Sequence, residues 1–358
     1  MRLRALFVLL VVAFSASDVG AQIGDATGLI PPRAAVPADN ADLRTDDQIN
    51  GSSWQINARL PEPRGSSQGA TVASSDGSLI YSVGGGCCHS DYPDGINRLW
   101  AYSPKDDSWS AAADVPVSDG IRAYGSAVEL NGFIYVFGGV AGPASNPRML
   151  NTTWIYDEAN DGWFEGANMP DFRAGSAVGT DGAVIWVIGG FKSLGFFDTT
   201  NTVWIYDPST DVYSTGFRDM PQYLGRIHGV MLADRTLHVL GGHWDMNDHW
   251  VYDTSADAWF SAPLIPSQVL DPAVATDGTL IYVGGANLDP PRGAGHTQIY
   301  DPATRVWSEG PRMPAPALNN TSGTIANGTF YVVGGYDGVA PSSVNYSLSL
   351  SGLGRSNR

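Results

Sequence analysis

The sequence has few cysteines, few charged residues and no long apolar run beyond its first residues. Its two cysteines are adjacent, so a disulfide bond can join only these two residues or another chain. Charged residues make up 16% of the 358 residues and the net charge is -16, which argues against nucleic acid or an anionic membrane as the partner. Helix-period patterns are scarce, and the 43 glycines and 23 prolines favour short strands joined by turns.

Residues 1–21 have the pattern of a secretory signal peptide. Two arginines supply the positive start, a short apolar core follows, and Val19-Gly20-Ala21 provides a small-residue cleavage site. The apolar core is too short for a membrane span, and no later segment qualifies. We therefore predict a secreted or periplasmic protein without membrane insertion, with a flexible leader over residues 22–49, which are rich in Pro, Ala and Asp.

A pair of glycines recurs along the chain and divides it into similar units. Each pair follows an apolar strand, as Gly138-Gly139 follows residues 133–137, and a turn dipeptide such as Asn131-Gly132 precedes that strand. The pairs are Gly84-Gly85, Gly138-Gly139, Gly189-Gly190, Gly241-Gly242, Gly284-Gly285 and Gly334-Gly335. Asn-Gly accepts the positive φ angles of a tight hairpin, and glycines at a strand end let another backbone come close.

Aromatic residues and prolines follow the glycine pairs at nearly constant spacing. A tyrosine comes first in each unit: Tyr102, Tyr156, Tyr206, Tyr252, Tyr300 and Tyr346. In the first five units another aromatic residue stands seven positions later: Trp109, Trp163, Tyr213, Trp259 and Trp307. A proline follows seven or eight positions further on. The sixth unit breaks off after Tyr346, and its missing segment is found at the other end of the chain as Trp54 and Pro61.

These units predict an all-β fold, a six-bladed β-propeller of four-stranded antiparallel blades. One blade cannot bury both of its faces, whereas a closed ring buries them between neighbours, with the Tyr and Trp positions as packing between blades. The strand at Trp54 is expected to complete the last blade and to remove an exposed sheet edge. We predict a propeller over residues 50–350 and a tail over residues 351–358.

The glycine pair, the tyrosine and the tryptophan seven residues later resemble kelch repeats. The resemblance extends over about residues 52–350 and implies a kelch β-propeller of the secreted or periplasmic six-bladed kind. It is specific for the fold and leaves the activity open, because this fold carries many unrelated functions.

The connections between strands differ at the two ends of such a propeller. If strands a to d run outwards in each blade, the a–b and c–d turns are short, whereas the b–c loops vary widely in length. Long, variable loops on a rigid scaffold are where binding usually occurs. We therefore predict a ligand site at the end that carries the d–a and b–c connections, here called the loop face, around the central channel. The opposite end, here called the turn face, is rich in aspartates that suit tight turns.

Arginines precede strand a in four blades and form the core of the predicted ligand site. A ring of guanidinium groups can bind a carboxylate or sulfate, or it can tie neighbouring loops together. The resemblance adds that some kelch propellers bind acidic peptides through arginines at the channel mouth, although blades 5 and 6 depart from this pattern. The candidate ligand-binding residues are Arg64, Arg122, Tyr124, Arg173, Arg226, His228, His89, Tyr92, Trp244 and Asn320.

Cys87 and Cys88 lie in the first b–c loop. Export favours disulfide bonds, yet neighbouring Cα atoms are about 3.8 Å apart, below the usual disulfide range. We predict a strained vicinal disulfide beside the ligand site, near His89 and Tyr92. The alternatives are free thiols or a bridge to another chain.

Several histidines and aspartates of the fourth unit have the chemistry of metal ligands. They are His228, His243, Asp245, Asp248 and His249. Their spacing matches no defined motif, so we predict no metal and no cofactor. His249 and His238 occupy positions that hold apolar or aromatic residues in other units, which indicates packing. Galactose-oxidase-like copper enzymes also use kelch repeats, but this chain lacks the adjacent Tyr-His pair which that resemblance requires.

The function predicted from these features is binding without catalysis, of a protein segment or a glycan that carries an acidic group. The alternative is a small-sugar isomerase, because periplasmic six-bladed kelch proteins include a sialic acid mutarotase. Isomerase chemistry needs a general acid and base near an anomeric oxygen, for which the candidates are His228, His89, Asp245 and Asp271. A deep mouth lined by such pairs favours the isomerase, whereas a shallow, aromatic-rich rim favours the binding protein.

Overall fold

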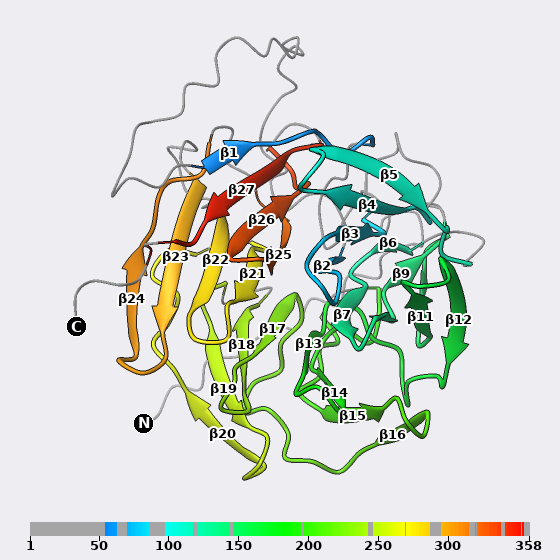
Figure 1. Ribbon diagram of the computed structural model, residues 1–358. Coiled ribbons are helices and arrows are strands. Elements are labelled where there is room, and N and C mark those ends of the chain that lie inside the picture. Colours follow the sequence, from blue (N-terminus) through cyan, green and yellow to red (C-terminus); the bar gives the residue numbers. More distant parts are fainter. Residues whose placement is uncertain are drawn as a thin grey trace, which may run out of the picture.

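The structure is a computed structural model in which the strands form a ring of blades around a central axis (Figure 1). It describes residues 54–62, 70–85, 97–116, 121–142, 146–194, 197–242, 246–268, 270–286, 295–314, 319, 321–337, 341–351 and 353. Cys87, Cys88, Arg64, His89, Tyr92, Trp244 and Asn320 lie outside the described residues.

Six four-stranded antiparallel sheets make up the described ring, each numbered here as a blade. Blade 1 contains β2 (Ala70–Ala73), β3 (Ile80–Val83), β4 (Leu99–Ser103) and β5 (Ser108–Ala112). Blade 2 contains β7 (Ser126–Leu130), β8 (Phe133–Phe137), β11 (Thr153–Asp157) and β12 (Gly162–Gly166). Blade 3 contains β13 (Ala177–Thr180), β14 (Ile185–Ile188), β15 (Val203–Asp207) and β16 (Val212–Ser214).

The remaining blades follow the same order from the axis outwards. Blade 4 contains β17 (Ile227–Met231), β18 (Thr236–Gly241), β19 (His249–Asp253) and β20 (Ala258–Ser261). Blade 5 contains β21 (Ala273–Thr276), β22 (Ile281–Ala286), β23 (Gly295–Asp301) and β24 (Val306–Glu309). Blade 6 contains β25 (Ser322–Ala326), β26 (Thr329–Val333), β27 (Asn345–Ser349) and the N-terminal β1 (Trp54–Ile56). The predicted six-bladed all-β propeller is confirmed.

The ring is closed by β1, which pairs antiparallel with β27 as predicted. Trp54 is buried, and its indole nitrogen donates to the carbonyl oxygen of Pro311 in the neighbouring blade 5 at 3.1 Å. Its ring packs against Phe330 of blade 6 at 5.8 Å between centroids. The closing strand therefore joins the last blade to its neighbour as well as completing its sheet.

The assignment of Tyr346 as the sixth repeat tyrosine is wrong. In blade 1, Tyr102 lies opposite both Trp109 and Ile80, whereas Trp54 lies opposite Leu348 in blade 6. Leu348 thus occupies the tyrosine position, and Tyr346 stands two residues earlier in the strand. The loop before β27 shifts the tyrosine relative to the glycine pair, so the spacing alone does not identify the equivalent position.

Both glycine signals have the predicted backbone role. Asn131 and Gly132 adopt φ angles of 57° and 84°, which a tight hairpin turn requires. A Cβ atom added at Gly138 would clash with the carbonyl oxygen of Arg173. The amide of Gly139 donates to that same oxygen at 2.7 Å, so the glycine pair lets the connection between blades cross the strand end closely.

The repeat aromatic residues join each blade to the one before it. Tyr156 donates its hydroxyl to Asp161 at 2.8 Å, and this carboxylate also accepts the amide of Ala113 in blade 1 at 2.7 Å. The indole of Trp163 donates to the carbonyl of Ala113 at 2.8 Å. The same tyrosine–aspartate contact to an amide of the previous blade recurs at Asp107, Asp211 and Asp257. The predicted packing between blades is therefore reinforced by hydrogen bonds.

Blade 5 departs from this pattern for a local reason. The residue equivalent to Ala113 is Pro263, which still accepts the indole of Trp307 at 2.9 Å but has no amide hydrogen to donate. Arg305 takes the place of the aspartate and donates to the carbonyl of Ser261 at 2.9 Å. An aspartate in place of Arg305 would have no amide of the preceding blade to accept from.

Candidate functional site

The loop face is held together by short pairings between the b–c loops and the d–a connections. In blade 2, β9 (Val140–Ala141) pairs with both β6 (Ile121–Ala123) and β10 (Arg148–Met149). Phe191 forms the equivalent bridge to Ala174, and Tyr336 forms one to Asn319. The backbone that follows each of these glycine pairs is thus fixed against the segment that leads into the inner strand of the blade.

Arg173 is buried between blades 2 and 3 and is not presented to solvent. Its guanidinium donates to the hydroxyl of Thr202 at 2.6 Å and lies over the Trp204 ring, 3.9 Å from the centroid. Burial lowers the pKa of Arg173 to about 10, and Asp171 offsets part of this effect. The side chain therefore ties loops of adjacent blades together, which was one of the two roles expected for these arginines.

Arg226 contacts side chains from two other blades. Its guanidinium donates to the hydroxyl of Tyr124 in blade 2, and its Nε atom lies 3.5 Å from a carboxylate oxygen of Asp271 in blade 5. Blade 3 separates Tyr124 from Arg226 in the ring, so the contact spans the mouth of the channel. The three residues, here called the axial cluster, have exposed fractions of only 0% (Tyr124), 8% (Arg226) and 2% (Asp271).

The backbone of the axial cluster is left-handed. The φ angles are 58° at Tyr124, 58° at Arg226 and 46° at Asp271, in the segments that lead into β7, β17 and β21. Residues other than glycine rarely adopt this conformation, and such positions gather at sites where the surroundings hold them. Here the ion pair and the hydrogen bond across the axis supply that restraint.

The strand registers also separate Arg226 from the other arginines. Arg173 stands four residues before Ala177, which lies opposite Ile188, whereas Arg226 stands two residues before His228, which lies opposite Leu240. Arg226 therefore occupies the repeat position of Tyr124, and the alignment of Arg226 with Arg122 and Arg173 is wrong. The connection between β16 and β17 is longer than the one between β12 and β13, which shifts Arg226 towards the inner strand relative to Arg173.

Of the other predicted residues, Arg122 lies within the short strand β6 and His228 lies on the inner strand β17. The Nε2 atom of His228 is buried and has no hydrogen-bond partner among the described residues. Burial lowers the pKa of His228 to about 4, so the imidazole is neutral at ordinary pH.

Three aromatic side chains lie exposed around the connection between β14 and β15. Their exposed fractions are 46% for Phe172, 73% for Phe197 and 65% for Tyr223. Phe172 and Tyr223 belong to the d–a connections on either side of blade 3, and Phe197 belongs to its b–c loop. We call these residues the aromatic rim. These residues are not among those predicted from the sequence, because single aromatic residues in connections of irregular length carry no periodic signal.

Backbone hydrogen bonds attach the three segments that carry the aromatic rim to one another. Phe191 exchanges hydrogen bonds with Ala174, two residues after Phe172, at 2.8 and 3.1 Å. Gly190 donates to the carbonyl of Leu224, next to Tyr223, at 2.8 Å, and Lys192 donates to that of Asp198, next to Phe197, at 2.8 Å. Each rim residue is therefore attached through its neighbours to the same loop.

Of the histidines and aspartates with the chemistry of metal ligands, His243 and Asp245 lie outside the described residues, and His249 packs with His238. His249 is buried, with its Nε2 atom 2.8 Å from Nδ1 of His238 and its own Nδ1 atom 3.2 Å from the carbonyl oxygen of Pro263. Both imidazoles pack against Tyr300 of blade 5, at 5.9 and 4.6 Å between centroids. Within the described ranges no three His, Cys, Asp or Glu side chains are placed to hold a metal ion.

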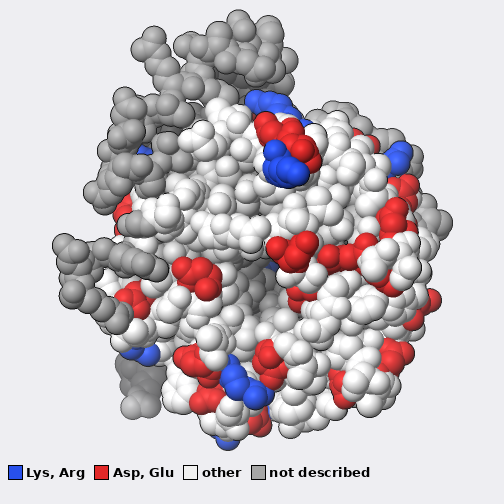
Figure 2. Space-filling model, viewed as in Figure 1, with Lys and Arg blue, Asp and Glu red and all other residues white. Residues whose placement is uncertain are grey.

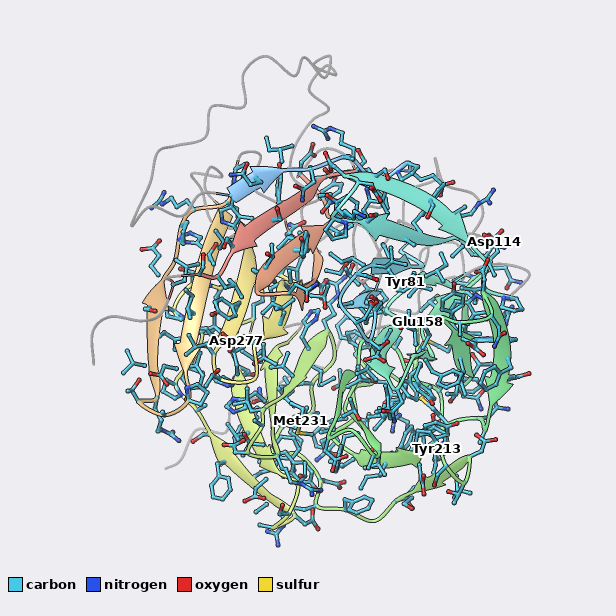
Figure 3. All side chains as sticks on the ribbon, in the orientation of Figure 1. Tyr81, Asp114, Glu158, Tyr213, Met231 and Asp277 are labelled. Carbon is cyan, nitrogen blue, oxygen red and sulfur yellow. The ribbon has the colours of Figure 1, made fainter. Side chains whose placement is uncertain are left out.

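Acidic side chains surround a central hollow on the face shown in Figure 2. Asp277 and Glu158, labelled in Figure 3, come from the a–b turn of blade 5 and the c–d turn of blade 2 on the turn face. Burial, together with the nearby Glu129, raises the pKa of Glu158 to about 7.

In the part of the chain that the structure describes, no helix has the length and hydropathy of a membrane span.

Together these features define a six-bladed β-propeller with an aromatic-rimmed loop face and a closed axial cluster. Residues 121–170 and 173–216 match the family model of the kelch motif. With its six repeated units and its propeller fold, the chain is a kelch-repeat β-propeller.

The relatives of this chain include kelch proteins of mammals. Human Kelch-like protein 23 is 25% identical over 311 residues, which cover 85% of this chain and 50% of that protein. Rat Kelch-like protein 21 is 24% identical over 323 residues, covering 79% of this chain and 51% of that protein. The chain thus spans about half the length of these curated relatives. The solved structure of YjhT superposes with a TM-score of 0.65 at 16% identity, covering 80% of this chain and 95% of that chain, and shows the same fold.

Proposed function

We propose that this protein is an exported kelch propeller that binds a partner protein through its loop face. The aromatic rim is the observation that supports this proposal most directly. Exposed aromatic side chains gathered on one surface are typical of protein-binding sites, because they bury much apolar area at a small entropic cost. The kinship with the Kelch-like proteins is consistent with an interaction module.

The chemistry of the rim indicates the contacts that the partner makes. Beside Phe172, the ammonium group of Lys192 lies 3.3 Å from the Asp171 carboxylate, and both side chains are partly exposed. The partner segment is expected to place apolar side chains on the aromatic residues and polar groups on this ion pair. Such a division into an apolar centre and a polar border is common at protein interfaces.

The axial cluster takes a smaller part in this proposal. Arg226 already has the Asp271 carboxylate beside it, so an acidic group of a ligand must replace an internal partner before it reaches the guanidinium. Exchange of one carboxylate for another gains little, because a buried charge that loses its partner is costly. We therefore assign the main contact to the aromatic rim.

Binding of selected peptides tests this assignment. A peptide display library screened on the purified protein is expected to yield ligands that lose about tenfold or more in affinity when Phe172, Phe197 and Tyr223 are all replaced by Ser. The control replaces three similarly exposed residues on outer strands, Phe164, Val212 and Phe260, by Ser. Peptides that bind the rim variant as tightly as the unmodified protein would refute the proposal.

A glycan array on the same variants separates the two ligand classes. If glycans bind to the aromatic rim, the ligand is a carbohydrate and the proposed protein ligand is wrong. If neither peptides nor glycans bind to the aromatic rim, the proposed binding role of the loop face is refuted.

Small-sugar isomerase activity is the second candidate function, and the state of the His228 side chain favours it. A neutral imidazole with an unsatisfied Nε2 atom near the channel mouth has the chemistry of a general base. Exchange spectroscopy between the α and β anomers of sialic acid and common hexoses tests this candidate. Faster exchange with the protein that disappears in His228→Ala would support it, and an unchanged rate would exclude it.

Export is proposed from the sequence of residues 1–21. Expression of the full chain in a secreting host is expected to release protein whose N-terminus is Gln22. Recovery of the unprocessed chain from the cytoplasm alone would contradict this.

A further inference from the structure

A pocket of about 500 Å³ opens on the turn face at the seam between blade 6 and blade 1. This volume lies within the range of about 300–1,000 Å³ that is usual for small-molecule sites. Blade 1 contributes Leu79, Pro104 and Lys105, and blade 6 contributes Ala326, Asn327 and Tyr331. We call it the seam pocket.

Small side chains at two repeat positions explain why this seam is open. In the next seam, between blades 1 and 2, the position of Pro104 is held by Glu158, whose Oε1 atom is buried. Glu158 also lies near Tyr81 of blade 1, as Figure 3 shows. At the seam after that, between blades 2 and 3, blade 2 has Leu130 where blade 6 has Ala326, each at the end of the inner strand. Each of these two seams thus has a larger residue at one of the two positions, whereas the seam between blades 6 and 1 has the smaller Pro104 and Ala326 at both.

The walls of the seam pocket combine apolar side chains with the polar groups of Ser78, Ser103, Asn327 and Thr329, and its border carries one positive charge. Leu79, Pro104 and Ala326 present aliphatic carbon, and the Tyr331 ring, 8% exposed, lies behind them. Lys105 is exposed at the border and makes no ion pair with the residues that the structure describes. No Asp or Glu is among the residues that line the pocket.

The carboxylates nearest to the pocket are bound by their own turns. Asp76 accepts the Ser74 hydroxyl and the Ser78 amide, both at 2.8 Å. Asp106 accepts the Ser103 hydroxyl at 2.8 Å. These carboxylates stay charged but face their own turns, and Lys105 is the charged side chain among the residues that line the pocket.

We propose that the seam pocket binds a small organic anion with a flat apolar body, the class represented by aromatic carboxylates. The apolar body lies between Leu79, Pro104 and Tyr331, and the carboxylate meets the ammonium group of Lys105. The pocket is on the face opposite to the aromatic rim, so this proposal is independent of the proposed function.

Binding at this place would also reinforce ring closure. The amide of Ala58, just after β1, donates to Asp107 of blade 1 at 2.7 Å, and the indole of Trp109 donates to the Ala58 carbonyl at 2.8 Å. These bonds join blade 6 to blade 1 across the same seam. A ligand that contacts both blades binds only the closed ring and therefore raises the midpoint temperature of unfolding.

Calorimetric titration of the full-length protein with naphthoate tests the proposal. We expect saturable binding of one naphthoate per chain, with neutral naphthamide bound about two- to fivefold more weakly because it lacks the charge. Lys105→Gln is expected to weaken naphthoate by a similar factor. Lys192→Gln removes the other lysine of the chain, on the loop face, and should leave binding unchanged.

Two variants test the location by filling the pocket. Ala326→Leu introduces the larger residue of blade 2 and should weaken naphthoate about tenfold or more through steric exclusion. Ser78→Tyr does the same from an exposed position, which keeps the test valid if Ala326→Leu fails to fold. Equal affinity in the folded pocket-filling variants would overturn the proposal.

Lysine modification supplies an independent readout, because the chain has only these two lysines. Under reductive methylation, naphthoate should protect Lys105 and leave Lys192 reactive. The absence of saturable binding at millimolar naphthoate, or protection of both lysines alike, would refute the seam pocket as an anion site.

Discussion

Aspartates in the c–d turns connect neighbouring blades with one carboxylate each. Asp161 accepts the hydroxyl of Tyr156 in its own blade and the amide of Ala113 in blade 1, so it satisfies two donors at once. Asp157 begins the same turn and accepts only from within it, from the amides of Ala159 and Asn160 and the side chain of Asn160. The two residues differ in whether their contacts cross the seam.

Replacement of Asp161 is therefore expected to cost more than replacement of Asp157. Asp161→Ala should lower the free energy of unfolding by about 2–3 kcal/mol, because it leaves two donors at the seam without an acceptor. Asp157→Ala should cost clearly less, since it affects one exposed turn. Urea unfolding followed by tryptophan fluorescence measures both, and equal losses would contradict the connecting role.

The buried histidine pair predicts a loss of stability in acid. Burial lowers the pKa of His238 to about 4 and that of His249 to about 3, below the ordinary value of 6.5. The folded state therefore binds fewer protons than the unfolded state below pH 6.5. Stability is full above that pH and falls as the pH drops towards 4, by roughly 2–3 kcal/mol for each of the two imidazoles at pH 4.5.

A matched variant isolates this effect from other titrating groups. His238→Tyr with His249→Leu installs the residues found at these positions in blade 1, Tyr81 and Leu99. The midpoint of thermal unfolding, measured from pH 7.5 to pH 4.5, should fall less steeply in the double variant. Parallel curves would show that the histidine pair does not control the acid response.

At the scale of the element, β1 is a short strand with a large effect on the ring. Only three residues form it, and Gln55 and Ile56 are exposed, yet Trp54 reaches blade 5 and the core of blade 6. A strand that closes a ring stabilises the seams on both sides of the last blade, because β1 completes blade 6 and its segment contacts blade 5 through Trp54 and blade 1 through Ala58. Its contribution should therefore be concentrated in the tryptophan.

Trp54→Ala is expected to lower the free energy of unfolding by about 3–5 kcal/mol through the loss of a buried aromatic side chain. Ile56→Ala in the same strand should cost less than about 1 kcal/mol, because Ile56 is 43% exposed. Deletion of residues 50–61 should lower the midpoint temperature at least as much as Trp54→Ala. An unchanged midpoint after the deletion would show that the ring does not depend on β1.

At the scale of the whole molecule, the axial cluster links three blades across the channel. Arg226 and Tyr124 are 102 positions apart in the chain, and Asp271 comes from a third blade. A buried ion pair adds little net stability against a well-packed apolar substitute, but removal of one partner leaves a charge uncompensated. The cluster is thus expected to show strong coupling.

Asp271→Ala should cost about 3–5 kcal/mol, whereas Arg226→Leu with Asp271→Ala should cost less than the sum of the two single changes. The pair of Arg235 and Asp181, 2.6 Å apart, is the control, and Arg235→Ala should cost about 1 kcal/mol or less because the Arg235 side chain is exposed. A double-mutant cycle by urea unfolding measures the coupling. Additive losses would mean that the ion pair does not hold the blades together.

The sequence by itself determined the repeat, the blade count and the closure by Trp54. These features arise from local rules: Asn131-Gly132 favours a tight turn, Gly138 permits a close crossing, and the aromatic spacing follows one blade at a time. Such rules act over a few residues and repeat in each unit, so one chain displays them six times.

Only the tertiary structure decided which residues meet across blades. It placed Asp271 beside Arg226, put Leu348 in the tyrosine position of blade 6, and left the seam pocket open between Pro104 and Ala326. These outcomes depend on residues far apart in the chain and on small shifts in loop length. The sequence periodicity reveals neither the long-range contacts nor the shifts in loop length, because a loop can change by two residues without altering the strands it joins.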